Sequence, residues 1–179
     1  MTPEDVIKKI VVIGPESTGK STLCEQLAAH FNTVWCPEYA RAYLNENGRE
    51  YSFDDLLRIG EGQLILEDAL LENVENNIYF IDTNMYVMKV WSEYVFEKCH
   101  QFILDSIVER DYHLYLLCNV DLPWIFDELR EYPEEASRKE LYNIYKDILI
   151  NQKTPWIEIS GNYDERLQKA IAAVEKHLL

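Results

Sequence analysis

The stretch VVIGPESTGKST, residues 11–22, carries most of the information about the fold of this chain. A short β-branched run ends at Gly14, and apolar residues resume at Leu23 with helical spacing after Gly19-Lys20-Ser21. The segment fits G-x-x-x-x-G-K-[ST] at every defined position, which is the pattern of a phosphate-binding loop between a strand and a helix. In such a loop, glycines let successive backbone N–H groups point at phosphate oxygens, and the helix N-terminus adds positive potential.

This loop predicts a site for a nucleotide and a magnesium ion. The Lys20 ammonium is expected to reach the β- and γ-phosphates, and the Ser21 hydroxyl is expected to bind Mg²⁺. A chance Gly-rich turn is the alternative, but the match lies between the first strand and the first helix of an α/β pattern. A GTPase would show Asn-Lys-x-Asp, which is absent, and a remodelling ATPase usually needs a larger domain. The small size therefore favours a nucleoside or nucleotide kinase.

Short apolar runs alternate with longer amphipathic segments along the chain. The expected strands are 9–13, 33–36, 78–81, 112–118 and 156–159, and the expected helices are 20–31, 53–73, 85–98, 134–150 and 164–179. Ser52 and Ser160 are candidate helix starts, at 53 and 164. Strands alternating with helices predict a parallel sheet covered on both faces, with ligands at the carboxyl ends of the strands. We expect one domain over residues 1–179, a three-layer α/β/α P-loop fold with a five-stranded parallel sheet and a helical lid.

Composition limits the partners and the compartment. The chain has 179 residues and a formal net charge of −15, which argues against a nucleic-acid partner or an anionic membrane surface. No segment is apolar for long enough to span a membrane, and residues 1–9 do not resemble a secretory signal. The four cysteines lie far apart and are expected to be free in a reducing environment. We therefore expect a cytoplasmic protein. The sequence leaves its oligomeric state open, and a homo-oligomer is one of the possibilities.

Acidic side chains follow two of the expected strands. Asp82 closes the run Ile78–Ile81 and is the candidate ligand of Mg²⁺, although it could instead only cap the next helix. Glu38 and Arg41 follow the strand 33–36 in PEYAR. Glu38 is expected to take the proton of the acceptor hydroxyl or to bind ribose, and Arg41 to position substrate or phosphate. The alternative for this pair is a solvated helical ion pair.

Residues 121–140 are expected to form a lid. This segment follows the fourth strand and holds Trp124, Asp127, Arg130 and Arg138 in an otherwise acidic chain. Cationic side chains on a mobile lid would close over the γ-phosphate, exclude water and stabilise the transferred charge. An ordinary surface helix with salt bridges is the alternative. Of the aromatic residues, Tyr39, Tyr86 or Trp91 are candidates to stack on a base, although core packing is the more common role.

Several motifs in this order resemble the ribosylnicotinamide kinase domain of NadR-type proteins. They are GPESTGKST, PEYARAYL, IDTN…KVWSEYVF, YHLYLLCNVDLPWIFDELREYP and ISGNYDERLQKA, which together extend over roughly residues 9–173. The resemblance implies ATP- and Mg²⁺-dependent phosphorylation of the 5′-hydroxyl of nicotinamide riboside, giving nicotinamide mononucleotide for NAD salvage.

The same resemblance implies a role for each matching residue. The ATP site corresponds to Gly14, Glu16, Ser17, Thr18, Gly19, Lys20, Ser21 and Thr22, with Ser21 and Asp82 at the metal. The residues assigned to catalysis are Lys20, Glu38, Asp82, Arg130 and Arg138. Those assigned to the nucleoside are Glu38, Arg41, Asp82 and Gln63, the last by resemblance alone.

Two features depart from the family pattern. Asn84 stands where the family usually has a second aspartate, so metal or ribose binding could be weaker or the acceptor could differ. The adenylyltransferase and DNA-binding modules of the longer proteins have no counterpart in these 179 residues, so a stand-alone kinase is expected. The alternatives are a kinase of another nucleoside or of a nucleoside monophosphate, and an ATP-binding switch with little turnover.

Overall fold

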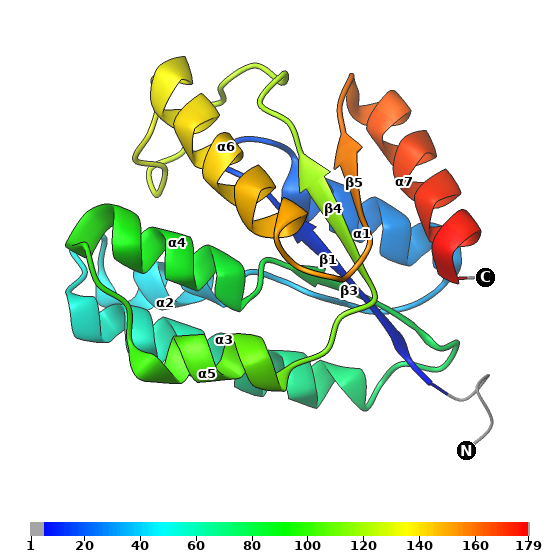
Figure 1. Ribbon diagram of the computed structural model, residues 1–179, viewed down its shortest axis with the longest axis horizontal. Coiled ribbons are helices and arrows are strands. Elements are labelled where there is room, and N and C mark those ends of the chain that lie inside the picture. The colour runs from blue at the N-terminus through cyan, green and yellow to red at the C-terminus, as the bar shows by residue number, and fades with distance from the viewer. Residues whose placement is uncertain (1–5, 179) are drawn as a thin grey trace.

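The computed structural model describes residues 6–178, which form a parallel sheet between layers of helices (Figure 1). The strands are β1 (Lys8–Ile13), β2 (Trp35–Cys36), β3 (Ile78–Asp82), β4 (Leu114–Cys118) and β5 (Trp156–Ile159), in the order β2-β3-β1-β4-β5. All neighbouring pairs are parallel, and β1 lies in the middle of the sheet between β3 and β4. The carboxyl end of β1, where the phosphate loop begins, is therefore flanked by the ends of two other strands.

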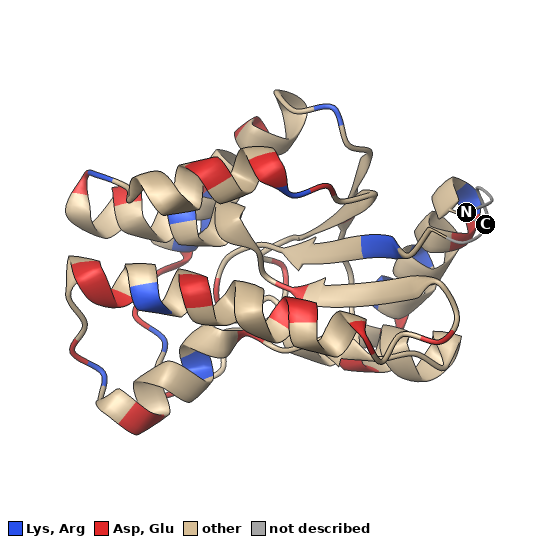
Figure 2. Cartoon of the chain, turned by 90° about the horizontal axis from the view of Figure 1, so that it is seen from below, with Lys and Arg blue, Asp and Glu red and all other residues tan. Residues whose placement is uncertain are grey.

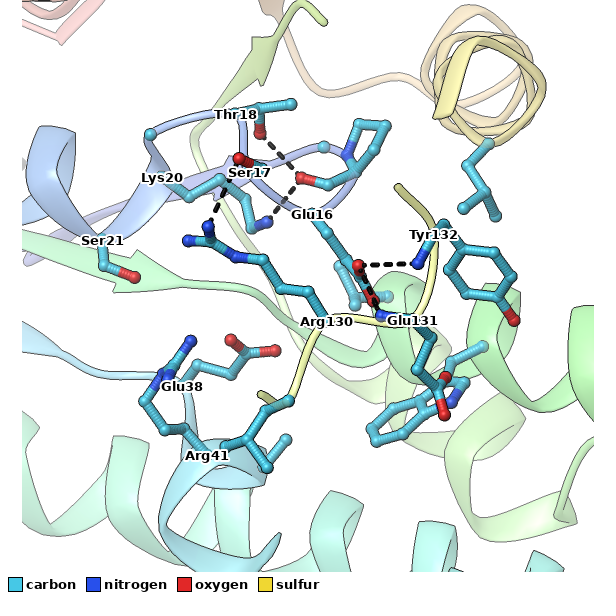
Figure 3. Close-up of a pocket in the computed structure, with 18 of the residues that line it drawn as sticks. Glu16, Ser17, Thr18, Lys20, Ser21, Glu38, Arg41, Arg130, Glu131 and Tyr132 are labelled. Atoms are coloured by element: carbon cyan, nitrogen blue, oxygen red, sulfur yellow. Dashed lines mark hydrogen bonds between the residues drawn. The ribbon is translucent and has the colours of Figure 1, made fainter. Parts of the chain in front are cut away.

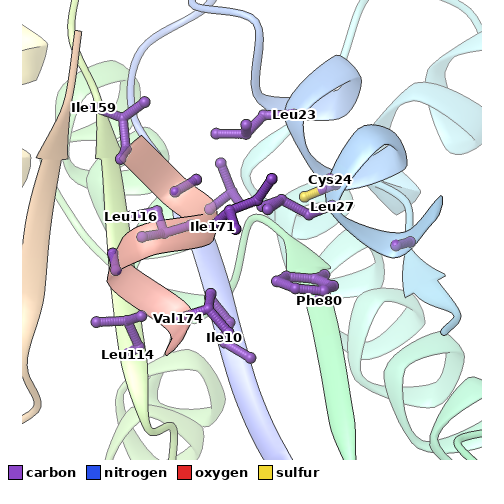
Figure 4. Close-up of a cluster of buried hydrophobic side chains, with 14 of the residues drawn as sticks. Ile10, Leu23, Cys24, Leu27, Phe80, Leu114, Leu116, Ile159, Ile171 and Val174 are labelled. Carbon is purple, nitrogen blue, oxygen red and sulfur yellow. The ribbon is translucent and has the colours of Figure 1, made fainter. Parts of the chain in front are cut away.

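Helices α1 (Lys20–Phe31) and α7 (Tyr163–Leu178) cover one face of the sheet. Figure 4 shows their apolar side chains meeting those of the strands. Leu23, Cys24 and Leu27 of α1 are buried against Phe80, Leu116 and their neighbours, and Ile171 and Val174 of α7 complete the cluster. Because this packing fixes the axis of α1, it also fixes the direction in which the helix N-terminus points.

Helices α3 (Phe53–Leu71), α4 (Met85–Phe96) and α6 (Glu135–Ile150) contribute to the core on the opposite face. A separate cluster joins α3 and α4 to the two short helices α2 (Tyr39–Asn47) and α5 (Gln101–Glu109). In Figure 1 these four helices lie together, to one side of the strands. The second cluster gives α2 and α4 a support of their own at the edge of the sheet.

The main differences from the sequence-based prediction concern short or irregular segments. The expected strands and long helices are all present, with ends shifted by a few residues, and Leu179 lies outside the described residues. Helices α2 and α5 were not expected, because nine residues offer too few turns for a clear apolar period. The lid is not helical before α6 begins at Glu135, since Pro123 and Pro133 interrupt it.

Side-chain hydrogen bonds mark where α3 and α7 begin. The prediction at Ser52 is confirmed, because its hydroxyl accepts from Asp55 N while the Asp55 carboxylate accepts from Ser52 N. The prediction at Ser160 is wrong. Asn162 caps α7 instead, and its side chain accepts from Glu165 N. A helix capped by Ser160 would begin at residue 161, whereas α7 begins at Tyr163.

Three further features of the molecule are the distribution of charged residues, the apolar character of the helices and the state of the cysteines. Figure 2 shows acidic residues scattered along the helices, with basic ones isolated among them. Within residues 6–178, no helix combines the length and the apolar character that crossing a membrane requires. All four cysteines are free, as expected.

Candidate functional site

A cavity of about 460 Å³ opens at the carboxyl ends of the strands. The phosphate loop forms one end, and α2, α4, α6 and the segment between β4 and α6 form the rest of the wall. Figure 3 shows side chains from these elements turned toward a common space. Residues 14 to 22 that line it are Gly14, Pro15, Glu16, Ser17, Thr18, Gly19, Lys20, Ser21 and Thr22, so the whole predicted nucleotide loop faces the cavity.

The loop is folded tightly on itself. Pro15 O accepts hydrogen bonds from the Thr18 hydroxyl at 2.7 Å and from Lys20 Nζ at 2.9 Å. Gly14 is required by close packing, because a Cβ there would lie 2.7 Å from Cys118 O and φ is +147°. Gly19 precedes α1 with φ of +76°, which turns the chain into the helix. The loop is thus shaped before any nucleotide arrives, with an ammonium group at its mouth.

Ser21 and Asp82 meet beside the loop. The Ser21 hydroxyl donates to Asp82 Oδ2 at 2.5 Å, while Asp82 Oδ1 is buried and has no hydrogen-bond partner in the described part of the chain. Burial, and the nearby Glu38 carboxylate, raise the pKa of Asp82 above its usual range. A buried carboxylate with an unused oxygen next to a hydroxyl suits Mg²⁺, which takes few protein ligands and keeps several waters. Within residues 6–178, no group of three or more His, Cys, Asp or Glu is arranged to hold a metal ion.

Asn84 does not stand beside this pair. Its side-chain oxygen accepts from Tyr86 N and caps α4, and its Nδ2 donates to the Tyr115 hydroxyl at 3.1 Å. Among the described residues, neither Asn84 nor Asp82 belongs to the cavity lining, but Asp82 accepts from the hydroxyl of Ser21, which does line it. The alternative that Asp82 is only a helix cap is therefore wrong, since Asn84 performs that task.

The predicted acceptor residues lie in different places. Glu38 lines the cavity at the N-terminus of α2. Arg41 also lines it, but its Nη1 pairs with Asp127 Oδ2 at 3.0 Å rather than with Glu38. Gln63 is buried outside the cavity lining, where its Oε1 accepts from Tyr39 N at 2.8 Å. In this structure Gln63 holds the start of α2, and so positions Glu38 from behind.

The segment between β4 and α6 is docked on the phosphate loop. The Glu16 carboxylate accepts from Glu131 N and Tyr132 N at 3.0 to 3.2 Å. The Ser17 hydroxyl accepts from Ile125 N at 3.1 Å and from Arg130 Nη1 at 3.3 Å. Burial raises the pKa of Glu16, against the two backbone N–H groups that lower it. Figure 3 shows the Arg130 side chain reaching across to the loop. The predicted lid thus contacts the nucleotide site directly.

The other lid arginine is buried. Arg138, in the first turn of α6, is 5% exposed and does not line the cavity. Its guanidinium lies 5.3 Å from the Trp124 ring, and its Nε and Nη1 have no hydrogen-bond partner. Arg130 lies over the same ring at 5.8 Å. Both arginines therefore lie beside the Trp124 ring.

An aromatic wall completes the cavity, and sequence reasoning found only part of it. Its members are Tyr51, Trp91, Tyr94, Tyr132 and Tyr145. Trp91 Nε1 donates to the Tyr51 hydroxyl at 2.8 Å, and that hydroxyl donates to Glu131 Oε2 at 2.8 Å. Of the candidates for stacking, Trp91 lines the cavity, whereas Tyr39 and Tyr86 do not. No local signal separates wall tyrosines from core tyrosines, because they come from four segments far apart in sequence.

Three comparisons with known proteins complete the description. A family profile described as an AAA domain matches residues 9–166. The Escherichia coli K12 protein described as "Trifunctional NAD biosynthesis/regulator protein NadR" is 28% identical over 177 residues, covering 95% of this chain and 42% of that protein. The chain thus spans less than half the length of this relative.

Two solved structures share the fold over 95% of this chain, each at 25% identity. One is described as NadR protein in complex with NR, with a TM-score of 0.78 and 50% of that chain covered. The other is described as NadR protein in complex with NAD and AMP-PNP, with a TM-score of 0.73 and 49% of that chain covered. The three-layer P-loop fold expected from the sequence is confirmed, and so is the resemblance to NadR.

Proposed function

We propose that this chain, which belongs to the AAA domain family, uses ATP and Mg²⁺ to phosphorylate the 5′-hydroxyl of nicotinamide riboside, forming nicotinamide mononucleotide for NAD salvage. One observation carries the proposal: a single cavity is lined by a phosphate loop, by the Glu38 carboxylate and by an aromatic wall. A donor nucleotide and an acceptor nucleoside can therefore meet in one space. The relatives solved with NR, an abbreviation of nicotinamide riboside, and with the ATP analogue AMP-PNP support this pairing.

The donor end binds and neutralises phosphate. Lys20 leaves Pro15 O and turns to the β- and γ-phosphates, which offer it a full negative charge in place of a carbonyl dipole. Ser21 and Asp82 would hold Mg²⁺, which when bound neutralises charge on the β- and γ-phosphate oxygens. Asp82 is ready for that role because one of its oxygens is buried without a partner.

The acceptor end orients the riboside. Glu38 takes the proton of the 5′-hydroxyl while that oxygen bonds to the γ-phosphorus and ADP leaves. The aromatic wall, with Trp91 at its centre, offers ring faces to a flat base. Nicotinamide riboside carries a positive pyridinium ring, which such faces attract as well as pack against. The acidic Glu131 beside the Tyr51 hydroxyl favours the same charge.

The lid excludes water and adds positive charge. Arg130 is already within reach of the phosphate loop through Ser17, so a small rotation brings it to the transferred phosphoryl group. Arg138, whose guanidinium nitrogens Nε and Nη1 have no partner, is a second cation close to the same lid. Exclusion of water matters here, because water competes with the 5′-hydroxyl for the γ-phosphate.

A product assay tests the proposal. The protein is incubated with MgATP and, separately, with nicotinamide riboside, other nucleosides and nucleoside monophosphates, and each reaction is followed by mass spectrometry for the gain of one phosphoryl group. Nicotinamide mononucleotide is the expected product. Product from another acceptor alone would sink the assignment of substrate. ATP binding without any phosphorylated acceptor would replace the kinase by a nucleotide-dependent switch. Omission of Mg²⁺ tests the metal in the same assay.

A further inference from the structure

Arg166 is the largest fully buried side chain within residues 6–178, yet it carries a charge. It belongs to the first turn of α7, in the closing motif ISGNYDERLQKA. The function proposed above gives this motif no role. A buried guanidinium is costly unless every donor is satisfied. Its partners therefore show what the position is for.

Those partners come from three different loops. Arg166 Nη1 donates to Thr18 O at 2.9 Å, Nη2 to Asn119 O at 3.0 Å, and Nε to Gly161 O at 2.7 Å. Nη2 also pairs with Asp121. One side chain thus ties together the phosphate loop after β1, the loop after β4 and the loop after β5.

Asp121 closes the same clamp from the other side. Its Oδ1 forms an ion pair with the Arg166 guanidinium, and its Oδ2 accepts a hydrogen bond from Gly161 N at 2.6 Å. Packing adds to these bonds. A Cβ on Gly19 would lie 3.0 Å from Leu122 and 3.3 Å from Tyr163, so the loop after β4 and the first residue of α7 pack closely on the phosphate loop.

The bond to Thr18 O has a direct consequence for phosphate binding. The peptide unit between Thr18 and Gly19 is planar and trans, so its C=O and N–H point in opposite directions. Because Arg166 holds this C=O from behind, the N–H of Gly19 points away from Arg166, on the side where Gly19 lines the cavity. The guanidinium also adds positive potential behind the loop, in a setting with little water to screen it.

We propose that Arg166, with Asp121, is a positioning residue that aims the backbone N–H of Gly19, in the phosphate loop, at the nucleotide phosphates. It does not touch the nucleotide, and acts through the peptide unit of Thr18 and Gly19. The inference rests on the function proposed above only in taking ATP as the nucleotide. It makes no use of the acceptor.

The test measures binding of AMP-PNP with Mg²⁺ by calorimetry, without any acceptor, together with the melting temperature. Arg166→Met removes all four contacts and keeps an apolar side chain of similar length. We expect its Kd for AMP-PNP to rise about tenfold or more, since bonds from a charged group are lost at a buried site. Arg166→Lys retains one charged donor, and its Kd is expected to rise only about threefold.

Arg110→Met is the matched control. Arg110 is likewise an arginine paired with acidic residues, here Glu67 and Asp68, but its side chain is 20% exposed and its partner Glu67 contacts Lys9 near the opposite end of β1. Its loss is expected to lower the melting temperature and leave the Kd for AMP-PNP unchanged. If Arg166→Met weakens AMP-PNP binding no more than Arg110→Met at a similar loss of melting temperature, Arg166 is merely structural and the inference is wrong.

A second variant covers the case in which Arg166→Met does not fold. Asp121→Asn keeps the bonds from Arg166 to the three carbonyls but weakens the clamp on Gly161, and its Kd is expected to rise about threefold. Wild-type affinity in both Asp121→Asn and Arg166→Lys would overturn the proposal. The kinase assay is independent of this result, so protein that binds AMP-PNP but phosphorylates no riboside would sink the proposed function alone.

Discussion

The two sides of the cavity are held in place by different kinds of contact. On the nucleotide side, buried contacts fix the phosphate loop. Arg166 donates a hydrogen bond to Thr18 O, and Gly14 packs against Cys118. On the lid side, residues between β4 and α6 are held by exposed ion pairs, such as Arg49 with Glu128, whose side chains are 56% and 69% exposed. Exposed ion pairs contribute about 0 to 1 kcal/mol each, so the stronger hold on the lid is the Glu16 carboxylate, which accepts from Glu131 N and Tyr132 N.

This difference suits a transfer enzyme. The phosphate loop must present its N–H groups in one arrangement, and rigidity there reduces the entropy lost when a nucleotide binds. The lid must open for both substrates and then close against water. The variants below test whether the two sides behave as differently as their contacts indicate.

Removal of the loop ammonium should have the largest effect on activity. Lys20→Ala is expected to lower phosphoryl transfer about 10³-fold or more, because a charge aimed at the transferred group is lost. The melting temperature without ligand should stay close to that of the wild type, since among residues 6–178 the Lys20 ammonium donates to Pro15 O alone. Product formation and thermal denaturation measure the two quantities. A fully active variant would contradict the assignment of the loop.

Gly14→Ala should have the largest effect on stability. A Cβ at this position meets Cys118 O at 2.7 Å, so we expect a loss of about 3 kcal/mol in the free energy of unfolding. Gly48→Ala is the control on the opposite side. Gly48 has φ of +96° and ψ of 169°, a backbone region that costs a residue with a Cβ about 1–3 kcal/mol. No described atom lies within 4 Å of its Cβ position, however, so the loss should lack the packing penalty and be smaller than that of Gly14→Ala. Urea denaturation gives both values, and equal losses would mean that the loop tolerates displacement.

Glu16 joins the two sides, and its loss should uncouple them. Glu16→Ala removes the acceptor for Glu131 N and Tyr132 N, and we expect transfer to fall about tenfold. ATP hydrolysis without acceptor should rise relative to transfer, because an undocked lid admits water. Glu16→Gln still offers an oxygen to the lid and should stay near wild type. Unchanged ratios of hydrolysis to transfer in Glu16→Ala would remove Glu16 from the closure of the lid.

Arg41 can act on the substrate or only on the lid. Its pairing with Asp127 is partly exposed, at 48% and 25%, so losing the pair alone should change kcat/KM by no more than about fivefold. If Arg41 only holds the lid, Arg41→Ala and Asp127→Ala will have equal effects. If Arg41 positions the acceptor, as predicted from the sequence, Arg41→Ala alone will raise the KM of the acceptor. Steady-state kinetics with both substrates varied distinguishes the two results.

The smallest effect is expected at Asn84, where the family usually has an aspartate. Asn84 caps α4 and bonds to Tyr115, and asparagine and aspartate cap helices about equally well. Asn84→Asp should therefore change activity less than about twofold, because the new carboxylate would serve the helix rather than the metal. A large gain in activity, or a lower Mg²⁺ requirement, would show that the position does contact the metal site.

Sequence and structure contributed different parts of the site. Gly14 to Thr22 and Asp82 could be proposed from sequence because a contiguous motif, or a carboxylate at the end of an apolar run, is recognised locally; the structure shows that the loop lines the cavity and that Asp82 accepts from Ser21. Gln63 was assigned to the nucleoside by resemblance, yet its amide is bonded to Tyr39 N outside the cavity lining. Arg138 was expected over the phosphate, and is instead buried beside Trp124. Residue type alone does not tell in which direction a side chain leaves its helix.

The sequence by itself determined the order of strands and helices, the phosphate loop and the carboxylate beside it. Each of these depends on neighbours along the chain, through apolar periodicity, glycine spacing and the meeting of parallel strand ends at one edge. Only the tertiary structure revealed the aromatic wall, the docking of the lid on Glu16 and the clamp of Arg166 on three loops. Those features join residues as far apart as Thr18 and Arg166, and such contacts exist only once long-range packing has closed the chain around them.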